Sequence, residues 1–323
     1  MRISPEKLAA EAQATGFRPD VLEKAAHLLG LLDAMRSHPF LQGKLVLKGG
    51  TALNLFVFDV PRLSVDIDLN YVGAEDRDGM LAERPKVEQA IQAVFAREGF
   101  AVRRMPEEHA GGKWSLRYES ALGRSGNLEV DINFMFRVPL WPVVTSDSHS
   151  VGTWRATGIP VLDRHELAAG KLAALLARRQ ARDLFDSHRI LRMENLDSHR
   201  LRIGFVVYGA MNSKDWRTVS SDDVDFDAMD LARQLVPTLR VNAAEVQAES
   251  AEYGARLVRE CREGLSAVLP FTNSEREFLD LLLDRGVIDP TLLTADKSFQ
   301  RCIQAQPLLK WKALNVRQHK GLS

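Results

Sequence analysis

The sequence predicts an α+β fold, in which a mixed sheet with flanking helices is followed by a mostly helical C-terminal domain. Polar and apolar residues alternate over Arg62 to Tyr71 and again over Leu128 to Phe136, as in half-buried strands. Segments of helical periodicity surround these strands, whereas helical patterns dominate the second half of the chain. We therefore expect two domains, residues 1–160 and 161–323.

The first half begins with helices. Ser4 suits an N-cap and Pro5 the first helical position, so a short helix is expected to start there. The other elements expected in this half are a helix from about Asp20 to Arg36, a short strand at Leu45 to Leu47, a helical segment from Thr51 to Phe56, a strand from Arg62 to Tyr71, a helix from Lys86 to Glu98, and strands near Lys113 to Tyr118 and Leu128 to Phe136 separated by turn-prone residues 123–127.

The second half is expected to open with two helices, His165 to Ala177 and Arg182 to Arg192. Most of the remaining chain is helical in pattern, and it is punctuated by Pro237, Pro270 and Pro290.

The bulk composition limits the class of protein. Hydrophobic residues make up 45% and charged residues 27% of the chain, as expected for a soluble globular protein. The 43 basic and 43 acidic residues cancel, so any binding to nucleic acid must use a local basic patch. Cys261 and Cys302 are expected to be free thiols, and no apolar run has the length of a transmembrane helix. We expect a cytoplasmic protein without a signal peptide.

The strand predicted at Arg62 to Tyr71 carries two carboxylates on one face. Side chains alternate along a strand, so Ser64, Asp66 and Asp68 share the polar side with Arg62. The carboxylates of Asp66 and Asp68 are expected to lie about 7 Å apart. Like charges so placed repel each other, and oxygen-seeking divalent cations such as Mg²⁺ relieve the repulsion. The alternative is an edge strand with a solvated acidic face.

A glycine turn precedes this strand. Lys48-Gly49-Gly50-Thr51 ends one strand and opens a helix, where glycines allow close approach of a phosphate and backbone N–H groups attract it. Lys48 and the Thr51 hydroxyl add a cation and a donor. The alternative is a plain strand-to-helix turn.

A third carboxylate is expected from the strand Leu128 to Phe136. Glu129, Asp131 and Asn133 share one face of it, and Asp131 is the favoured metal ligand because Val130 and Ile132 flank it. The alternative is a solvated or turn-capping aspartate.

The order of these motifs resembles that of the DNA polymerase β-like nucleotidyltransferase superfamily. Within it, residues 48–53 and 62–69 are similar to motifs of the AbiEii/AbiGii toxin family, which includes the mycobacterial MenT toxins. The second half matches the same family through Lys171 and the pattern Arg178-x-x-x-Arg182-Asp183-x-x-Asp186. The fold is thus expected to be of the nucleotidyltransferase type.

The distance between Lys171 and Asp186 limits how this second group of residues can be arranged. On one unbroken helix Lys171 and Asp186 would lie about 22 Å apart, too far for a shared site. The chain must therefore turn near Arg179-Gln180, although no glycine or proline marks the position. The alternative is a solvated helix surface with an Arg182–Asp186 ion pair.

The resemblance implies a magnesium-dependent enzyme that transfers a nucleoside monophosphate from an NTP (ATP, GTP, CTP or UTP) to an acceptor. Two Mg²⁺ ions would be held by Asp66 and Asp68, with Asp131 as a further ligand. Lys171 would neutralise the triphosphate and Asp186 would orient Lys171 or the nucleotide, with Asp183 less favoured. The residues expected to bind the nucleotide are Lys48, Gly49, Gly50, Thr51, Ser64, Arg178 and Arg182.

The resemblance also implies the biological role, a toxin that modifies the 3′ end of tRNA, blocks translation and is encoded beside an antitoxin. Basic residues and an aromatic ring that could contact such an acceptor are Arg178, Arg179, Arg182, Arg189, Arg192, Arg200, Arg202, Lys310, Trp311, Lys312, Arg317 and Lys320. Nucleotidylation of a protein or small molecule, and a non-catalytic NTP-binding module, are the alternatives.

Overall fold

The computed structural model describes residues 2–104, 111–241 and 250–321. The chain divides into two compact units. The main division lies between Leu162 and Asp163. Unit 1 comprises Met1–Arg137, Val143–Leu162 and Val236–Gln247, and unit 2 comprises Val138–Pro142, Asp163–Leu235 and Ala248–Ser323. Each unit takes one short segment from the other half of the chain, and neither segment was predicted.

Unit 1 contains a seven-stranded sheet in the order β3-β4-β5-β2-β1-β7-β6. Its β2–β5 and β1–β7 pairs are parallel and the other pairs are antiparallel, which confirms the predicted mixed sheet. The strands are β1 (Leu45–Lys48), β2 (Asp66–Tyr71), β3 (Ala101–Arg104), β4 (Gly111–Glu119), β5 (Ser125–Asn133), β6 (Val144–Ser146) and β7 (Ile159–Val161).

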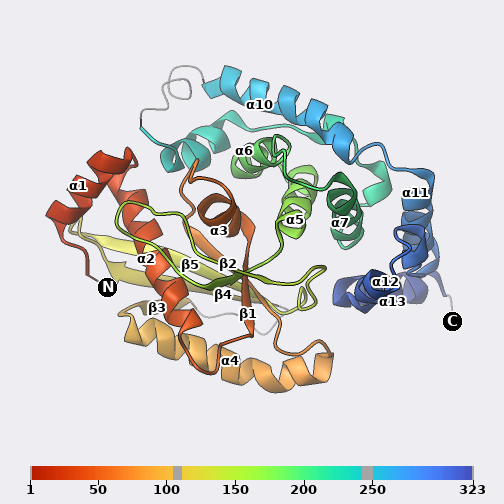
Figure 1. Ribbon diagram of the computed structural model, residues 1–323, viewed down its shortest axis with the longest axis horizontal. Helices are drawn as coiled ribbons and strands as arrows, with labels where there is room; N and C mark the ends of the chain where they lie inside the picture. Colours follow the sequence, from red (N-terminus) through yellow and green to blue (C-terminus); the bar gives the residue numbers. More distant parts are fainter. Residues whose placement is uncertain (1, 105–110, 242–249, 322–323) are drawn as a thin grey trace. The chain divides into compact units, whose positions relative to one another are not determined.

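Helices cover both faces of this sheet. Figure 1 shows α3 and α4 on opposite sides of it, and the Phe95 ring of α4 lies 6.1 Å from the ring of the fully buried Trp114 of β4. The helical elements of unit 1 are α1 (Pro5–Thr15), α2 (Pro19–Arg36), α3 (Gly49–Ala52), the π-helix η1 (Leu53–Val57), α4 (Arg77–Arg97) and the 3₁₀ turn η5 (Val236–Thr238).

Alternation along the central strands separates the core from the polar face. Ile67, Leu69, Val130 and Ile132 are buried, as predicted, and form the core on the side that α4 covers. The residues between them on β2 and β5 are partly exposed on the side of α3. An apolar cavity of about 230 Å³ lies on the core side, lined by Leu47 and Leu69 and by the end of α2, so it is separated from the polar face by the sheet.

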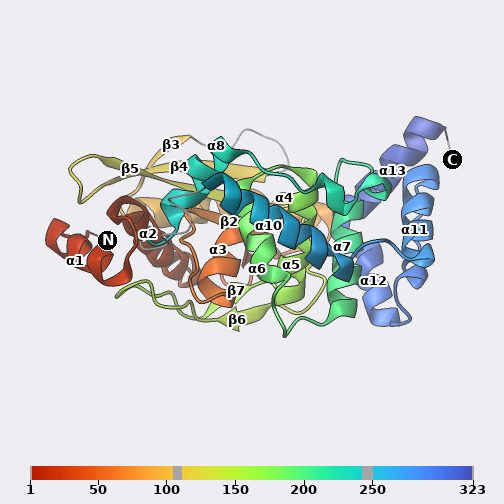
Figure 2. The ribbon, with the colours of Figure 1, turned by 90° about the horizontal axis from the view of Figure 1, so that it is seen from above.

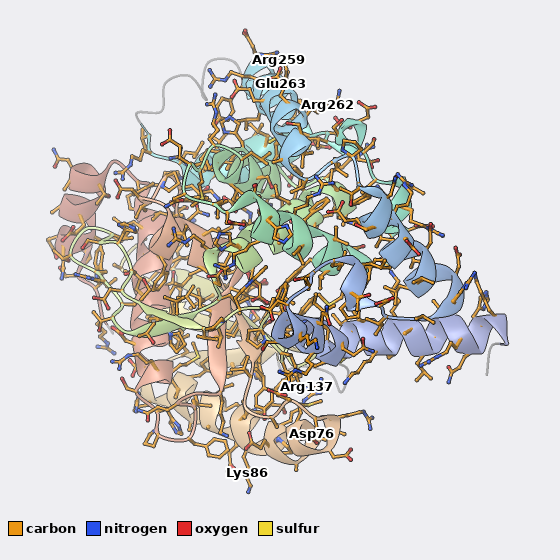
Figure 3. All side chains as sticks on the ribbon, turned by 45° about the vertical axis from the view of Figure 1, so that its right-hand side comes forward. Asp76, Lys86, Arg137, Arg259, Arg262 and Glu263 are labelled. Carbon is orange, nitrogen blue, oxygen red and sulfur yellow. The ribbon has the colours of Figure 1, made fainter. Side chains whose placement is uncertain are left out.

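Arg137 ties the end of β5 to the connection between β2 and α4. Its Nε donates to the Glu75 carbonyl at 2.6 Å and its Nη1 to the Phe134 carbonyl at 3.2 Å. Asp76, next to Glu75, caps α4 by accepting from the Gly79 N–H at 2.8 Å (Figure 3). These contacts fix the ends of the two strands that carry the predicted carboxylates.

Unit 2 is helical, as predicted. The helix α5 packs against α6 and α7, and α10 runs along α6 (Figures 1 and 2). Its helices are α5 (Arg164–Ala177), α6 (Ala181–Ile190), α7 (Ser198–Ala210), α8 (Ala228–Asp230), α10 (Ser250–Gly264), α11 (Asn273–Asp280), α12 (Lys297–Ala305) and α13 (Pro307–Lys320). Shorter turns are η2 (Trp216–Thr218), η3 (Ser221–Asp223), η4 (Leu231–Leu235), η6 (Leu265–Ala267), η7 (Leu281–Arg285) and η8 (Pro290–Leu292).

A buried carboxylate in unit 2 holds the segment Val138–Pro142. Glu166 of α5 accepts hydrogen bonds from the Leu140 N–H at 3.0 Å and from the Tyr208 hydroxyl at 2.8 Å. Burial raises the pKa of Glu166 to about 7, and these hydrogen bonds oppose the rise. From α12, the Cys302 thiol contacts the Pro139 carbonyl at 3.3 Å.

Three predicted elements have wrong boundaries. The strand expected from Leu128 to Phe136 spans Ser125–Asn133, so it begins and ends three residues earlier. The strand expected from Arg62 begins only at Asp66, because Leu63 bonds outside the sheet, to the Thr238 carbonyl at 2.8 Å. Arg62, Leu63 and Ser64 are all buried, whereas a half-buried strand alternates between buried and exposed residues. The helix expected from Lys86 begins at Arg77 and contains Pro85, which obscured its first half in the sequence.

Cys261 and Cys302 are both present as thiols. Among the described helices, none combines the length and the apolar character that crossing a bilayer requires.

Candidate functional site

The predicted carboxylates of β2 and β5 lie side by side. The two strands are parallel, with Asp66 beside Glu129 and Asp68 beside Asp131. Register partners on adjacent strands point to the same face, and that face is the polar one. The structure therefore brings together Asp66, Asp68 and Asp131, which the sequence placed on two separate strands.

The backbone of Gly49 packs closely against the Asp68 side chain. Its φ is +72°, a left-handed conformation that favours glycine. A Cβ at this position would lie 2.4 Å from Oδ2 of Asp68, far inside van der Waals contact. Lys48, directly before it on β1, is the register partner of Asp68 on the other side. The glycine turn and the carboxylate strand are thus parts of one site.

The Thr51 hydroxyl has a partner within the protein. Thr51 is fully buried, and its Oγ1 donates to the Asp66 carbonyl at 2.5 Å. Asn54, also buried, donates from Nδ2 to the Gly50 carbonyl at 2.9 Å. The Thr51 bond joins the start of α3 to the start of β2, and the Asn54 bond ties η1 to the glycine turn. In this geometry the Thr51 hydroxyl donates within the protein and holds the turn in place.

Lys48, Ser64 and Asn133 are the other residues of the two predicted motifs and of β5 that lie near the site. The ammonium group of Lys48 lies 5.4 Å from the centre of the Phe136 ring, an interaction that positions it at the end of β1. Ser64 is 5% exposed and precedes β2. The Asn133 side chain caps the turn after β5 by accepting from the Met135 N–H at 2.7 Å.

Lys113 of β4 was not predicted as part of the site. It is the register partner of Asp131, and its Nζ lies 2.6 Å from Oε2 of Glu129. The contact with Glu129 raises the pKa of Lys113, and the charges of Asp66 and Asp131 raise it further. The sequence placed Lys113 on an alternating strand, but nothing local revealed that this strand lies next to β5.

The donor set suits a magnesium ion that arrives with a nucleotide. Within the described residues, no group of three or more His, Cys, Asp or Glu side chains is arranged to enclose a metal ion. Mg²⁺ commonly uses one or two carboxylates together with substrate phosphates. The adjacent carboxylates of Asp68 and Asp131, with the space that Gly49 leaves beside Asp68, match that mode of binding.

In unit 2 the chain turns between α5 and α6, as the distance between Lys171 and Asp186 on one unbroken helix required. Helix α5 ends at Ala177, Arg178 is extended with φ −148° and ψ 143°, and α6 begins at Ala181. The break near Arg179-Gln180 was predicted from distance alone, and it is confirmed.

The turn brings Lys171 to two aspartates. Its Nζ lies 2.8 Å from Oδ1 of Asp183 and 3.1 Å from Oδ2 of Asp186. Asp183, which the sequence analysis favoured less than Asp186, contacts Lys171 as closely as Asp186 does, because residues three apart lie on the same side of a helix. The aspartates are 2% and 0% exposed, which excludes the alternative of a solvated helix surface.

Arg178 completes this cluster, with its Nε 2.7 Å from Oδ2 of Asp183. Burial raises the pKa of Asp183, but the positive charges of Lys171 and Arg178 outweigh burial and lower it overall. Asp183 is therefore held as a carboxylate between two cations. Arg182 is partly buried on the following turn.

Most of the basic residues expected to meet a polyanionic acceptor have acidic partners. The Lys312 side chain, whose pKa burial lowers, instead donates to the Asn212 carbonyl. Trp311 is 57% exposed. The ion pairs are Arg179–Asp225, Arg192–Glu260, Arg200–Asp163, Arg202–Glu275 and Lys320–Asp284.

Comparisons with known proteins identify the family of this chain. A search of curated proteins gave no match. The structure is similar to that of MenT4, a nucleotidyltransferase toxin from Mycobacterium tuberculosis H37Rv, with a TM-score of 0.63 over 96% of this chain and 99% of that one. The two sequences are 17% identical, so this likeness concerns the fold. The model of the family described as nucleotidyl transferase AbiEii toxin, type IV TA system, matches residues 30–274. The match spans well over half of the sequence, and the chain therefore belongs to the AbiEii nucleotidyltransferase toxin family.

Proposed function

We propose that this protein transfers a nucleoside monophosphate from an NTP to an RNA hydroxyl, with the tRNA 3′ end as acceptor, and so inhibits translation in the cytoplasm. The observation that supports the proposal most is the placement of Asp68 beside Asp131, with Gly49 against the Asp68 carboxylate. Carboxylates beside a glycine turn suit a triphosphate with its counter-ions. A cognate antitoxin, expected for a member of this family, would counteract the activity.

The carboxylates of Asp66, Asp68 and Asp131 would hold two Mg²⁺ ions. When bound, Mg²⁺ would polarise the α-phosphate and favour the ionised form of the acceptor hydroxyl. The acidic face alone would repel a triphosphate, so NTP binding is expected to require the cation.

The turn after β1 would hold the β- and γ-phosphates. Gly49 and Gly50 present backbone without side chains, and Lys48 supplies a positive charge next to Asp68. Thr51 ties this turn to the start of β2 through its hydrogen bond to the Asp66 carbonyl, and Asn54 supports the turn through its hydrogen bond to the Gly50 carbonyl. Ser64 would act beside them as a further nucleotide contact.

In unit 2, Lys171 would supply positive charge to the triphosphate as pyrophosphate leaves. Its contacts with Asp183 and Asp186 hold the ammonium group in place and restrict the rotamers of the Lys171 side chain. Asp186 would orient Lys171, and Asp183 shares that role. Arg178 and Arg182 would contact phosphate groups of the nucleotide or of the acceptor.

The acceptor can be identified with labelled nucleotides. Purified protein is incubated with each α-labelled NTP, Mg²⁺, total tRNA and a protein extract. Label that migrates with tRNA, and that is lost when the terminal 3′ hydroxyl has been oxidised, is the expected result. Label on protein or on neither fraction would contradict the proposal.

One observation favours a second candidate, nucleotidylation of a protein or small molecule. Many of the basic side chains expected to bind a polyanion are already neutralised, as in the pairs Arg202–Glu275 and Arg192–Glu260. Binding of tRNA would have to break these pairs or use other cations. The same labelling experiment separates the two candidates.

A further inference from the structure

A row of charges crosses four neighbouring strands of unit 1. Lys113 of β4 is the register partner of Asp131 on β5. Asp131 is in turn the partner of Asp68 on β2, and Asp68 is the partner of Lys48 on β1. Because register partners share a face, the two carboxylates at the centre of the row have a lysine on either side. Lys48 follows from the family motif, whereas Lys113 belongs to none of the motifs that the sequence revealed.

Lys113 is held in place by a carboxylate outside the predicted metal ligands. Its Nζ lies 2.6 Å from Oε2 of Glu129, which is itself the strand neighbour of Asp66. The side chains of Lys113 and Glu129 are 60% and 46% exposed, so a stable ion pair at this place gains little from burial. The larger effect of the Lys113 charge is on the neighbouring carboxylates of β2 and β5.

Asp66, Asp68, Glu129 and Asp131 occupy one face of two adjacent strands. Without a cation they repel one another, and each additional positive charge stabilises the face. The raised pKa of Lys113 reflects its attraction to Glu129, Asp66 and Asp131. A positive charge at this position must also oppose the arrival of a second cation.

We propose that Lys113 is the resident counter-ion of the carboxylate face, which stabilises the metal-free protein and lowers its affinity for divalent cations. Glu129 is the residue that keeps the Lys113 ammonium group beside Asp131. This inference rests on the proposed metal-binding role of Asp66, Asp68 and Asp131, and it adds a residue that sets metal affinity.

Metal binding without nucleotide tests the proposal. Mn²⁺ is titrated into the full-length protein, and free Mn²⁺ is followed by electron paramagnetic resonance. Lys113→Met is expected to bind Mn²⁺ about three- to tenfold more tightly than the wild type, since one repelling charge has been removed at short range. The gain should shrink at high salt, because both side chains of the pair are exposed. In EDTA, the same variant should have a lower Tm and gain more from added Mn²⁺ than the wild type does.

Arg117→Met is the matched control. Arg117 is on the same strand and the same face, four residues from Lys113, and is likewise exposed, with its Nε 2.8 Å from the Ser125 hydroxyl. It removes the same charge about 13 Å farther along the strand and should leave Mn²⁺ affinity nearly unchanged.

The outcomes are distinguishable. If Asp68→Asn fails to weaken Mn²⁺ binding, the metal site itself is refuted, and the role of Lys113 with it. If Asp68→Asn weakens binding but Lys113→Met leaves the affinity unchanged, only the role of Lys113 is overturned. Equal tightening in Lys113→Met and Arg117→Met would also overturn it, because the effect would then come from net charge and not from position.

Discussion

Asp68 and Asp131 are register partners on adjacent parallel strands, although 63 positions separate them in the chain. Gly49 packs against the Asp68 carboxylate from the start of α3. The close approach to Asp68 and the left-handed φ of Gly49 together explain why a glycine is found at this position. They also suggest a pair of substitutions that separates backbone strain from damage to the site.

Gly49→Ala is expected to abolish nucleotide transfer. The new Cβ would collide with Oδ2 of Asp68, and the left-handed backbone would add about 1–2 kcal/mol of strain. Gly43→Ala is the control, since Gly43 has a similar φ of +71° and nothing within 4 Å of the added Cβ. Both variants should lose stability in denaturant unfolding, but only Gly49→Ala should lose transfer. Equal transfer in the two variants would contradict the close contact.

Lys171→Met should destabilise the protein by about 3–5 kcal/mol, because it leaves Asp183 and Asp186 buried with too little positive charge. Transfer at saturating NTP should also fall severely. Adding Asp183→Asn and Asp186→Asn to Lys171→Met removes the uncompensated charge and should recover much of the stability but not the transfer. Recovery of both would show that Lys171 serves the fold alone.

Glu166 is expected to make stability fall as pH rises from about 4.5 to 7. Its pKa is about 7 in the folded protein, against 4.5 when exposed, so the folded state binds the proton more tightly. The stabilisation is complete below the lower value and is lost as pH passes through the upper one. The change is of order 3 kcal/mol.

The measurement is the free energy of unfolding of wild type and Glu166→Gln from pH 4.5 to 8. The variant should lack this component of the pH dependence, because glutamine stays neutral. Glu119→Gln, which alters a 91% exposed carboxylate, is the control and should retain the wild-type profile. A Glu166→Gln profile parallel to that of the wild type would refute the buried-carboxylate explanation.

Raising the salt concentration should weaken acceptor binding more than NTP binding, because a polyanion releases more counter-ions. The dependence should nevertheless be shallow, since the Arg192 and Arg202 charges are paired with Glu260 and Glu275. Filter binding of tRNA and of NTP from low to physiological salt measures both slopes. Equal slopes would count against a polyanionic acceptor.

Much of the site could be predicted from local pattern. Alternation placed Asp66 and Asp68 on one face, and a simple limit on reach required the helix break before Asp186. Contacts between distant segments could not be predicted in this way. Arg62 to Val65 looks like a strand, but the Leu63 N–H bonds to Thr238, 175 positions away. Lys113 was missed for the same reason, because the pairing of β4 with β5 decides which charges it meets.

The most direct test of the account is transfer of α-labelled nucleotide to tRNA by the wild type and by Asp68→Asn, assayed with all four NTPs and Mg²⁺. We predict labelled tRNA with the wild type and a loss of at least about a thousandfold in the transfer rate of Asp68→Asn. The Tm values of the two proteins should agree within a few degrees. Transfer by Asp68→Asn at the wild-type rate would contradict the claim that the carboxylates of β2 and β5 form the catalytic centre.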